Sequence, residues 1–460
     1  METFDVVIVG AGTAGETLAE ALVKKGRSVA LVEANRVGGE CPFVACMPSK
    51  ALLRSAHVRH LFPVLPDLGA GTRPYQPDDD RAAYELAVRR RDRIVEDRDD
   101  AEHARGVEEA GVTLVRGWGC VARPGVVAVG DRELGYHDLV ITTGSQPVHP
   151  QIDGLDAVPT WTSDEAMSSY DYPESLAIMG GGAVGCEFAQ LFAGFGCRVT
   201  LLEAAPRLLP ANSAEMGALL ADVLRGSGID VRLGARVERA EADPRGARLT
   251  LDDGAAVTAA RVIVAVGRKA TVEGLGLEIL GIQAGKNGLD IDASGRVEGQ
   301  PHVWAAGDVT GDARYTHAAN VEARLLATNI LGGAATLDLH AIPRVMYVEP
   351  ECASVGLATV RAAQAAGHDA IGAAVDLRQT ERAVTDGTRI GRLELVADRK
   401  RRVLLGAAII GPHASEWIGE ATLAVQAGIP LDTLARVVHP FPTFSSVYEL
   451  ALGQLIEAAS

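Results

Sequence analysis

The chain has 460 residues, enough for about three domains of ordinary size, and its 47% apolar and 23% charged residues are typical of a globular protein with a large core. A net charge of −16, with no long basic run, argues against nucleic acid or anionic lipid as a partner. No stretch approaches the roughly 20 apolar residues needed to cross a bilayer, and no secretory signal precedes the first strand. We therefore expect a cytoplasmic protein with no membrane partner.

The N-terminal segment predicts a βαβ unit. A β-branched run over residues 4–9 leads into GAGTAG at residues 10–15, an amphipathic segment follows, and a second apolar run ends at Glu33. In such a unit Gly10 makes the tight turn, Gly12 lets the backbone approach a pyrophosphate, and Gly15 lets helix and strand pack closely. The acidic residue at the end of the second strand would accept hydrogen bonds from a ribose.

The same pattern recurs in the middle of the chain. SLAIM leads into GGGAVG, with Gly180, Gly182 and Gly185 in the three positions, and CRVTLLE ends at Glu203 after the same number of residues as in the first unit. Two such units are far more specific than a single glycine-rich turn. Because the Glu203 carboxylate would repel a 2'-phosphate, we expect NAD(H) rather than NADP at this site; Arg207 is the nearest cation.

The remaining segments complete an α/β fold. LVITTGSQP, RVIVAVGRKA and VWAAGDVTG are apolar strands that end in glycine-containing turns, and the last places Asp308 at a strand end. From about residue 339 the composition changes, which indicates a separate C-terminal domain. The charged segment over residues 81–100 is interpreted as a solvated helix face.

A cysteine pair follows the first βαβ unit. Residues 38–50 read GGECPFVACMPSK, with Cys41 and Cys46 on either side of PFVA. Six cysteines in this length do not make a disulfide framework, and no second Cys or His pair completes a zinc site, so no metal centre is expected. A redox disulfide is the better interpretation of the pair.

With these motifs the chain resembles, over nearly its whole length, the flavoprotein (pyridine nucleotide) disulfide oxidoreductases, the family of dihydrolipoamide dehydrogenase. The resemblance implies two Rossmann-like domains plus an α+β C-terminal dimerisation domain. The expected boundaries are residues 1–148 and 269–338 for FAD, 149–268 for NAD and 339–460 for dimerisation. FAD is expected at Gly10, Gly12, Gly15, Glu33 and Asp308, and NAD(H) at Gly180, Gly182, Gly185 and Glu203, with Gly39, Lys50, Thr143, Gly144, Gly267, Gly307 and His317 completing the cofactor-binding set.

The resemblance also implies the catalytic roles. Electrons would pass from the nicotinamide through the flavin to a Cys41–Cys46 disulfide. Cys46 would lie against the flavin and Cys41 would exchange with substrate, while Lys50 and Glu187 would form an ion pair beside the flavin. The active site would be shared across a homodimer.

The segment VHPFPTFSSVYE departs from the family pattern. Where the family carries His-Pro-Thr, any residue, Ser-Glu, this chain has Phe441 and Ser446 at the places of the His-Glu dyad. His439 is a weak substitute base, and Ser445 or Ser446 is expected to cap the next helix.

We therefore expect an oxidoreductase that acts on a small disulfide, dithiol, thioether or quinone-like substrate. Three alternatives stay open. One is an ordinary dihydrolipoamide dehydrogenase. Another is a C–S cleaving enzyme resembling 2-ketopropyl-coenzyme M oxidoreductase/carboxylase, which also has phenylalanine at this place, and the third is a non-catalytic flavin-binding scaffold.

Overall fold

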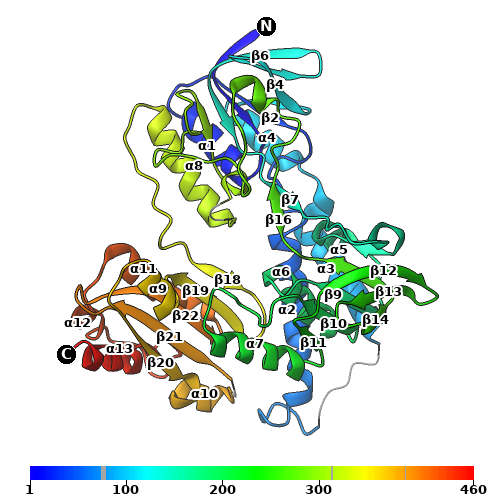
Figure 1. Ribbon diagram of the computed structural model, residues 1–460, viewed down its shortest axis with the longest axis vertical. Helices are drawn as coiled ribbons and strands as arrows, with labels where there is room; N and C mark the ends of the chain where they lie inside the picture. The colour runs from blue at the N-terminus through cyan, green and yellow to red at the C-terminus, as the bar shows by residue number, and fades with distance from the viewer. Residues whose placement is uncertain (74–78, 312–313, 389) are drawn as a thin grey trace. The chain divides into compact units, whose positions relative to one another are not determined.

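The computed structural model describes residues 1–73, 79–311, 314–388 and 390–460 (Figure 1). The chain divides into two compact units. Unit 1 comprises residues 1–49, 91–148 and 267–339, and unit 2 comprises residues 50–90, 149–266 and 340–460. Each unit is therefore assembled from three separate stretches of sequence.

Unit 1 is built on a mostly parallel sheet with strand order β3-β2-β1-β6-β5-β4, in which β17 also pairs with β6. Alternate residues of β1 face opposite sides: Val6 and Ile8 pack with helices α1 and α8, and Val7 and Val9 pack against a second buried cluster. β1 therefore has a continuous apolar sequence because both of its faces are covered. The elements are β1 (Glu2–Val9), α1 (Thr13–Val23), β2 (Val29–Glu33), α4 (Ala101–Glu109), β3 (Thr113–Arg116), β4 (Gly119–Arg123), β5 (Val126–Val129), β6 (Arg132–Ile141), β17 (Val303–Ala305) and α8 (Thr316–Ile330), with β7 (Ser145–Pro147) and β16 (Arg268–Ala270) forming a separate antiparallel pair.

Unit 2 contains a parallel sheet of order β11-β10-β9-β15-β8. A three-stranded antiparallel sheet shares a buried cluster with one face, and helices α2 and α6 contribute to the cluster on the other. This is the second dinucleotide-type layer structure that the repeated motif predicts. Its elements are β8 (Thr160–Trp161), α5 (Ser163–Ser168), β9 (Ser175–Met179), α6 (Ala183–Ala193), β10 (Arg198–Glu203), α7 (Ala214–Gly226), β11 (Asp230–Leu233), β12 (Val237–Asp243), β13 (Gly246–Leu251), β14 (Ala256–Ala259) and β15 (Arg261–Val264). Helices α2 (Cys46–His60) and α3 (Asp80–Ile94) belong mostly to this unit, while their residues 46–49 and 91–94 are counted in unit 1.

The C-terminal part of unit 2 is an antiparallel sheet of order β18-β19-β22-β21-β20. Helices α11 and α13 contribute to the buried cluster on one of its faces (Figure 1). The elements are β18 (Arg344–Met346), β19 (Glu351–Gly356), α9 (Val360–Ala365), β20 (Ala370–Asp376), α10 (Glu381–Asp386), β21 (Arg392–Asp398), β22 (Val403–Gly411), α11 (Ala414–Ala427), α12 (Leu431–Leu434) and α13 (Val447–Ala458).

The predicted α/β class is confirmed by these sheets. The interpretation of residues 81–100 as a solvated helix face is wrong at its C-terminal end, because Arg91 and Asp92 are 0% and 5% exposed. Arg91 Nε donates to Asp92 Oδ1 at 2.8 Å and Arg98 Nη1 to the same oxygen at 3.0 Å, so the buried charges compensate one another. Across the described ranges, no helix combines the length and apolarity that a bilayer crossing requires.

Candidate functional site

The two glycine fingerprints have nearly the same backbone geometry. Gly10 has φ +107° and Gly180 φ +105°, and both turns lead into a helix. A Cβ on Gly15 would lie 2.0 Å from the Gly10 carbonyl oxygen, and one on Gly185 would lie 1.9 Å from that of Gly180. Only glycine fits these two contacts, as expected for close packing of helix on strand.

The acidic residues that follow are fixed in matching ways. Glu33 accepts the backbone N–H of Ala11 at 2.7 Å, and Glu203 accepts that of Gly181 at 2.6 Å. A Cβ built on Gly182 would meet no atom within 4 Å, so a ligand has room to approach the backbone there. Both fingerprints therefore fit a dinucleotide, with its pyrophosphate at the helix N-terminus and its ribose near the glutamate.

The nearest cation to Glu203 in sequence is already engaged. Arg207 Nη1 donates to the carbonyl oxygens of Asn212 and Ser213 at 2.8 and 2.9 Å, and Nη2 donates to that of Pro210 at 2.8 Å. Its guanidinium therefore stabilises the loop before α7.

The cysteine motif packs directly on the first fingerprint. Gly38 donates its backbone N–H to the Ala11 carbonyl at 2.8 Å, and a Cβ on Gly39 would lie 2.9 Å from the Cα of Gly12. Helix α2 then begins at Cys46. The cysteine motif therefore runs directly into a helix.

Both thiol sulfurs lie around one hydroxyl group. Thr316 Oγ1 donates to Cys41 Sγ at 3.2 Å and lies 3.7 Å from Cys46 Sγ. Thr316 is the first residue of α8, far from both cysteines in sequence. Sequence reasoning selected its neighbour His317 instead, whose exposed ring stacks on Tyr315 with centroids 5.3 Å apart.

A polar network connects the thiol motif with the strand ends of unit 1. Arg268 Nη2 donates to Glu40 Oε2 at 2.5 Å, and its Nε donates to Ser145 Oγ at 2.7 Å. Ser145 Oγ in turn donates to Asp308 Oδ2 at 2.5 Å. Arg268 lies within the motif AVGRKA, but the motif does not indicate that its side chain reaches the residue beside Cys41.

Among the other predicted cofactor-binding residues, Thr143 and Gly144 follow β6, Gly307 follows β17 and Gly267 precedes β16. Thr143 Oγ1 donates to the Thr271 carbonyl at 2.6 Å, and a Cβ on Gly144 or Gly267 would meet no atom within 4 Å. Gly307 donates its N–H to the buried Glu322 carboxylate at 2.5 Å. The turns at Gly144 and Gly267 are therefore open on the side where a side chain would project.

The predicted Lys50–Glu187 pair is formed within unit 2. Lys50 Nζ lies 2.8 Å from Glu187 Oε2, and the Glu187 side chain is 8% exposed. The other carboxylate oxygen accepts the backbone N–H of Tyr347 at 2.8 Å, and Lys50 Nζ lies 4.8 Å from the centroid of the Tyr347 ring. Lys50 is also one helical turn after Cys46 on α2.

The loop before α13 presents phenylalanine and shields histidine. Phe441 is 76% exposed, whereas the His439 side chain is 5% exposed. His439 Nε2 lies 2.9 Å from a Glu420 oxygen and Nδ1 lies 3.2 Å from a Glu449 oxygen. With both ring nitrogens in hydrogen bonds, His439 is poorly placed to exchange a proton with a substrate.

The expected serine cap of α13 is corrected. Ser446 occupies the N-cap position, but its hydroxyl makes no capping hydrogen bond and donates instead to the Thr443 carbonyl at 2.8 Å. Its helical backbone dihedrals, φ −59° and ψ −18°, differ from the extended conformation of a capping serine.

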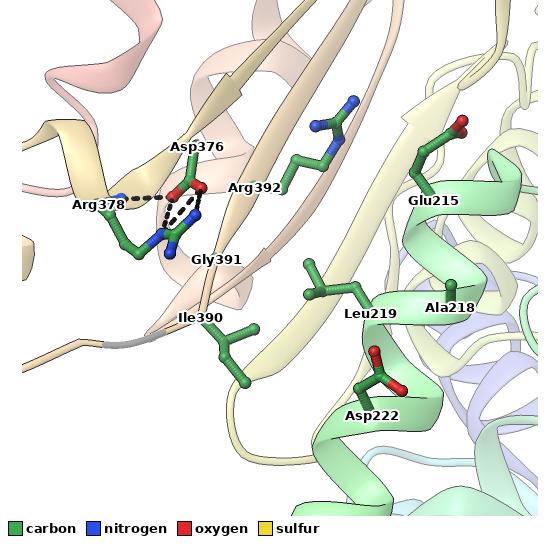
Figure 2. Close-up of a pocket in the computed structure, with 9 residues that line it drawn as sticks. All are labelled: Glu215, Ala218, Leu219, Asp222, Asp376, Arg378, Ile390, Gly391 and Arg392. Atoms are coloured by element: carbon green, nitrogen blue, oxygen red, sulfur yellow. Dashed lines mark hydrogen bonds and ion pairs between the residues drawn. The ribbon is translucent and has the colours of Figure 1, made fainter.

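A pocket of about 440 Å³ lies between α7 and the segments around β20 and β21. Figure 2 shows the residues that line it. None of the predicted site residues is among the nine that line it. Its two arginines already contact acids: Arg378 contacts Asp376, and Arg392 contacts Glu394. The pocket is therefore separate from the predicted thiol motif and fingerprints.

Comparison with known proteins shows the family of the chain. Residues 4–323 match the family described as pyridine nucleotide-disulphide oxidoreductase, and residues 342–452 match its dimerisation domain. Similar relatives include a mercuric reductase of Streptomyces lividans, 34% identical over 97% of this chain and 95% of the relative. A dihydrolipoyl dehydrogenase of Thermus scotoductus is 33% identical over 97% and 96%.

A similar solved structure is the HOCl-induced flavoprotein disulfide reductase RclA from Escherichia coli, determined as a Cu(II) complex. It has a TM-score of 0.85 and 26% identity, over 99% of this chain and 100% of RclA. The chain therefore belongs to the pyridine nucleotide-disulphide oxidoreductases, a family of FAD- and NAD(P)H-dependent enzymes.

Proposed function

We propose that Cys41 and Cys46 form a redox-active pair that exchanges electrons with a small sulfur-containing or quinone-like substrate, without a His-Glu dyad. The observation that carries this proposal is the convergence of both sulfurs on Thr316 Oγ1, at 3.2 and 3.7 Å, on a motif packed against the first fingerprint. When bound, FAD supplies two-electron exchange between NAD(P)H and such a pair.

The surrounding residues favour negative charge on sulfur. Cys46 is the first residue of α2, where the helix dipole stabilises a thiolate, and the Thr316 hydroxyl donates toward Cys41. The charge of Glu40 beside Cys41 is offset by Arg268 at 2.5 Å. These contacts prepare the thiols for disulfide exchange without a neighbouring base.

NADH is the proposed reductant. Glu203 is held by backbone hydrogen bonds at the end of β10, where it would repel a 2'-phosphate, and Arg207 is occupied by loop carbonyls. The preference rests on this electrostatic argument.

Anaerobic reductive titration tests the thiol pair. The FAD-loaded protein is expected to take up one more two-electron equivalent of NADH than its Cys41→Ser variant, because the disulfide stores one electron pair. Cys120→Ser is the matched control, because it also removes one thiol, but from β4 and not from the cysteine motif. It should take up as much NADH as the wild type. Equal uptake by wild type and Cys41→Ser would contradict the proposal, and no uptake at all would favour the scaffold alternative. Repeating the titration with NADPH tests the nucleotide preference.

The loss of the dyad is proposed to change the substrate class. Phe441 has no titratable group, and His439 is held between two carboxylates. The site would therefore offer a dithiol substrate no acid/base group of the usual kind. This disfavours dihydrolipoamide, although a dihydrolipoyl dehydrogenase is among the relatives. The apolar ring would suit a thioether substrate, whose cleavage must keep protons away from a carbanion-like intermediate.

Restoring the dyad tests this part of the proposal. The double variant Phe441→His/Ser446→Glu is expected to raise dihydrolipoamide:NAD activity about 10-fold or more, because positioned acid/base groups contribute at least that much. Phe441→Ala, which removes the ring without adding a base, should show no such gain. Wild-type turnover of about 10 per second or more would instead identify an ordinary dihydrolipoamide dehydrogenase.

A further inference from the structure

Two histidines and a carboxylate meet on unit 1 at a place that includes none of the predicted site residues. His137 and Asp138 are on β6, and His302 immediately precedes β17. One ligand atom from each of the three side chains lies within 4.8 Å of the others. His137 Nδ1 is 2.8 Å from Asp138 Oδ2, and His302 Nδ1 is 3.4 Å from Asp138 Oδ1.

Strand pairing creates this arrangement. β17 runs parallel to β6 with Val303 beside Leu139, and the Leu139 N–H donates to the His302 carbonyl at 2.9 Å, which sets His302 beside Asp138. Asp138 and His302 are 164 positions apart in sequence, so no local sequence pattern relates them.

The carboxylate is rigid, and the two imidazoles are accessible. The Asp138 side chain is 12% exposed and accepts a hydrogen bond at 3.0 Å from Nε1 of Trp304, itself a buried residue. The side chains of His137 and His302 are 69% and 54% exposed, so small rotations of their rings can bring a nitrogen to a shared ligand. A buried donor that orients a carboxylate is a common support of metal ligands.

We propose that His137, Asp138 and His302 bind a divalent transition-metal ion such as Zn²⁺, with water in the remaining positions. Two imidazoles and one carboxylate suit Zn²⁺ and its neighbours better than Mg²⁺ or Ca²⁺, which prefer oxygen ligands alone. Pairing of β1 with β6 also sets Asp5 next to His137, which adds a second carboxylate near the site; Arg27, 3.9 Å from Asp5, offsets part of that charge. The alternative is a His–Asp–His cluster that satisfies its own hydrogen bonds and binds no ion.

Such an ion would join β6 to the start of β17. β17 has three residues and leads directly to Gly307 and Asp308. A metal bridge at the N-terminal end of β17 would therefore stabilise the strand that positions Gly307 and Asp308. We expect Zn²⁺ to raise the melting temperature of the protein, independently of its redox activity.

The test uses the full chain without a polyhistidine tag, in a Cys41→Ser/Cys46→Ser background that removes the competing thiol ligands. Isothermal titration with Zn²⁺ is expected to show one saturable site per chain and a rise in melting temperature. His302→Ala should weaken binding at least about 10-fold and abolish the thermal shift. His149→Ala is the matched control, because His149 lies 2.5 Å from Asp156 and is 51% exposed, yet is not part of the three-ligand group.

The proposal is overturned if the parent protein shows no saturable site, or if His302→Ala binds Zn²⁺ as tightly as the parent. His137→Ala serves as the second variant if circular dichroism shows that His302→Ala is unfolded. Unchanged affinity in that variant would equally contradict the site.

Discussion

At the scale of single residues, the site depends on side chains that meet from distant parts of the sequence. Thr316 contacts Cys41 from 275 positions away, and Arg268 contacts Glu40 from 228 positions away. The cysteines, glycines and glutamates were predicted as site residues because they recur at fixed short spacings along the sequence. Thr316 and Arg268 were missed because no local pattern relates them to their partners.

Replacing Thr316 tests whether its hydroxyl stabilises the reactive thiolate. Thr316→Val is expected to slow alkylation of the NADH-reduced protein by iodoacetamide about 10-fold at pH 7, since loss of a hydrogen bond to a charged group costs about 1.5 kcal/mol or more. Thr316→Ser keeps the hydroxyl and should react at the wild-type rate. Equal rates in all three proteins would mean that the contact has no influence on the thiols.

At the scale of elements, α2 combines several functions on one helix. Cys46 begins it, Lys50 lies one turn later and pairs with Glu187, and His57 lies two turns after that in a largely buried position. The sequence predicted a redox role for the cysteine pair at the start of this helix. It did not predict the burial of His57, because that depends on the segment around Glu349, whose carboxylate lies 3.9 Å away.

Burial lowers the pKa of His57 to about 4, so the native state holds the neutral ring. An unfolded chain binds a proton at an ordinary pKa of about 6.5, and the stability contributed by His57 is therefore present above about pH 6.5 and lost as the pH falls toward 4. Between pH 6.5 and pH 4 the expected loss in the free energy of unfolding is on the order of 2 to 3 kcal/mol. His57→Leu should reduce the fall in melting temperature between pH 7 and pH 5 by a few °C.

His60→Leu provides the control for this pH effect, because His60 is an exposed histidine on the same helix. It should show the wild-type fall in melting temperature. An identical fall in His57→Leu would mean that other groups govern the acid sensitivity.

At the scale of the whole molecule, the chain carries a dimerisation domain and an exposed apolar loop within it. Val438 is 90% and Phe441 76% exposed, and Leu423 and Leu450 on α11 and α13 are 62% and 45% exposed. Because single exposed apolar side chains are common on monomers, the match to a dimerisation domain is what points to an interface here. We infer that this surface contacts a second copy of the chain.

Introducing a charge into this surface tests the inference. Val438→Asp is expected to weaken self-association at least about 10-fold, because an unpaired carboxylate would be buried at the interface. Val384→Asp changes a valine of similar exposure, 76%, on α10 and should leave association unchanged. Sedimentation velocity over a range of protein concentrations measures both, and a dimer of unchanged stability in Val438→Asp would contradict the interface.

The two dinucleotide units, the cysteine motif and the phenylalanine at position 441 can be read from the sequence alone. Each of these is encoded by residue types at fixed local spacing, which the backbone geometry of a βαβ turn or a helix start requires. Only the tertiary structure decided which side chains surround the thiols, which histidine is buried, and that His137 and His302 share Asp138. These contacts depend on strand pairing and on packing between distant segments, which local spacing does not encode.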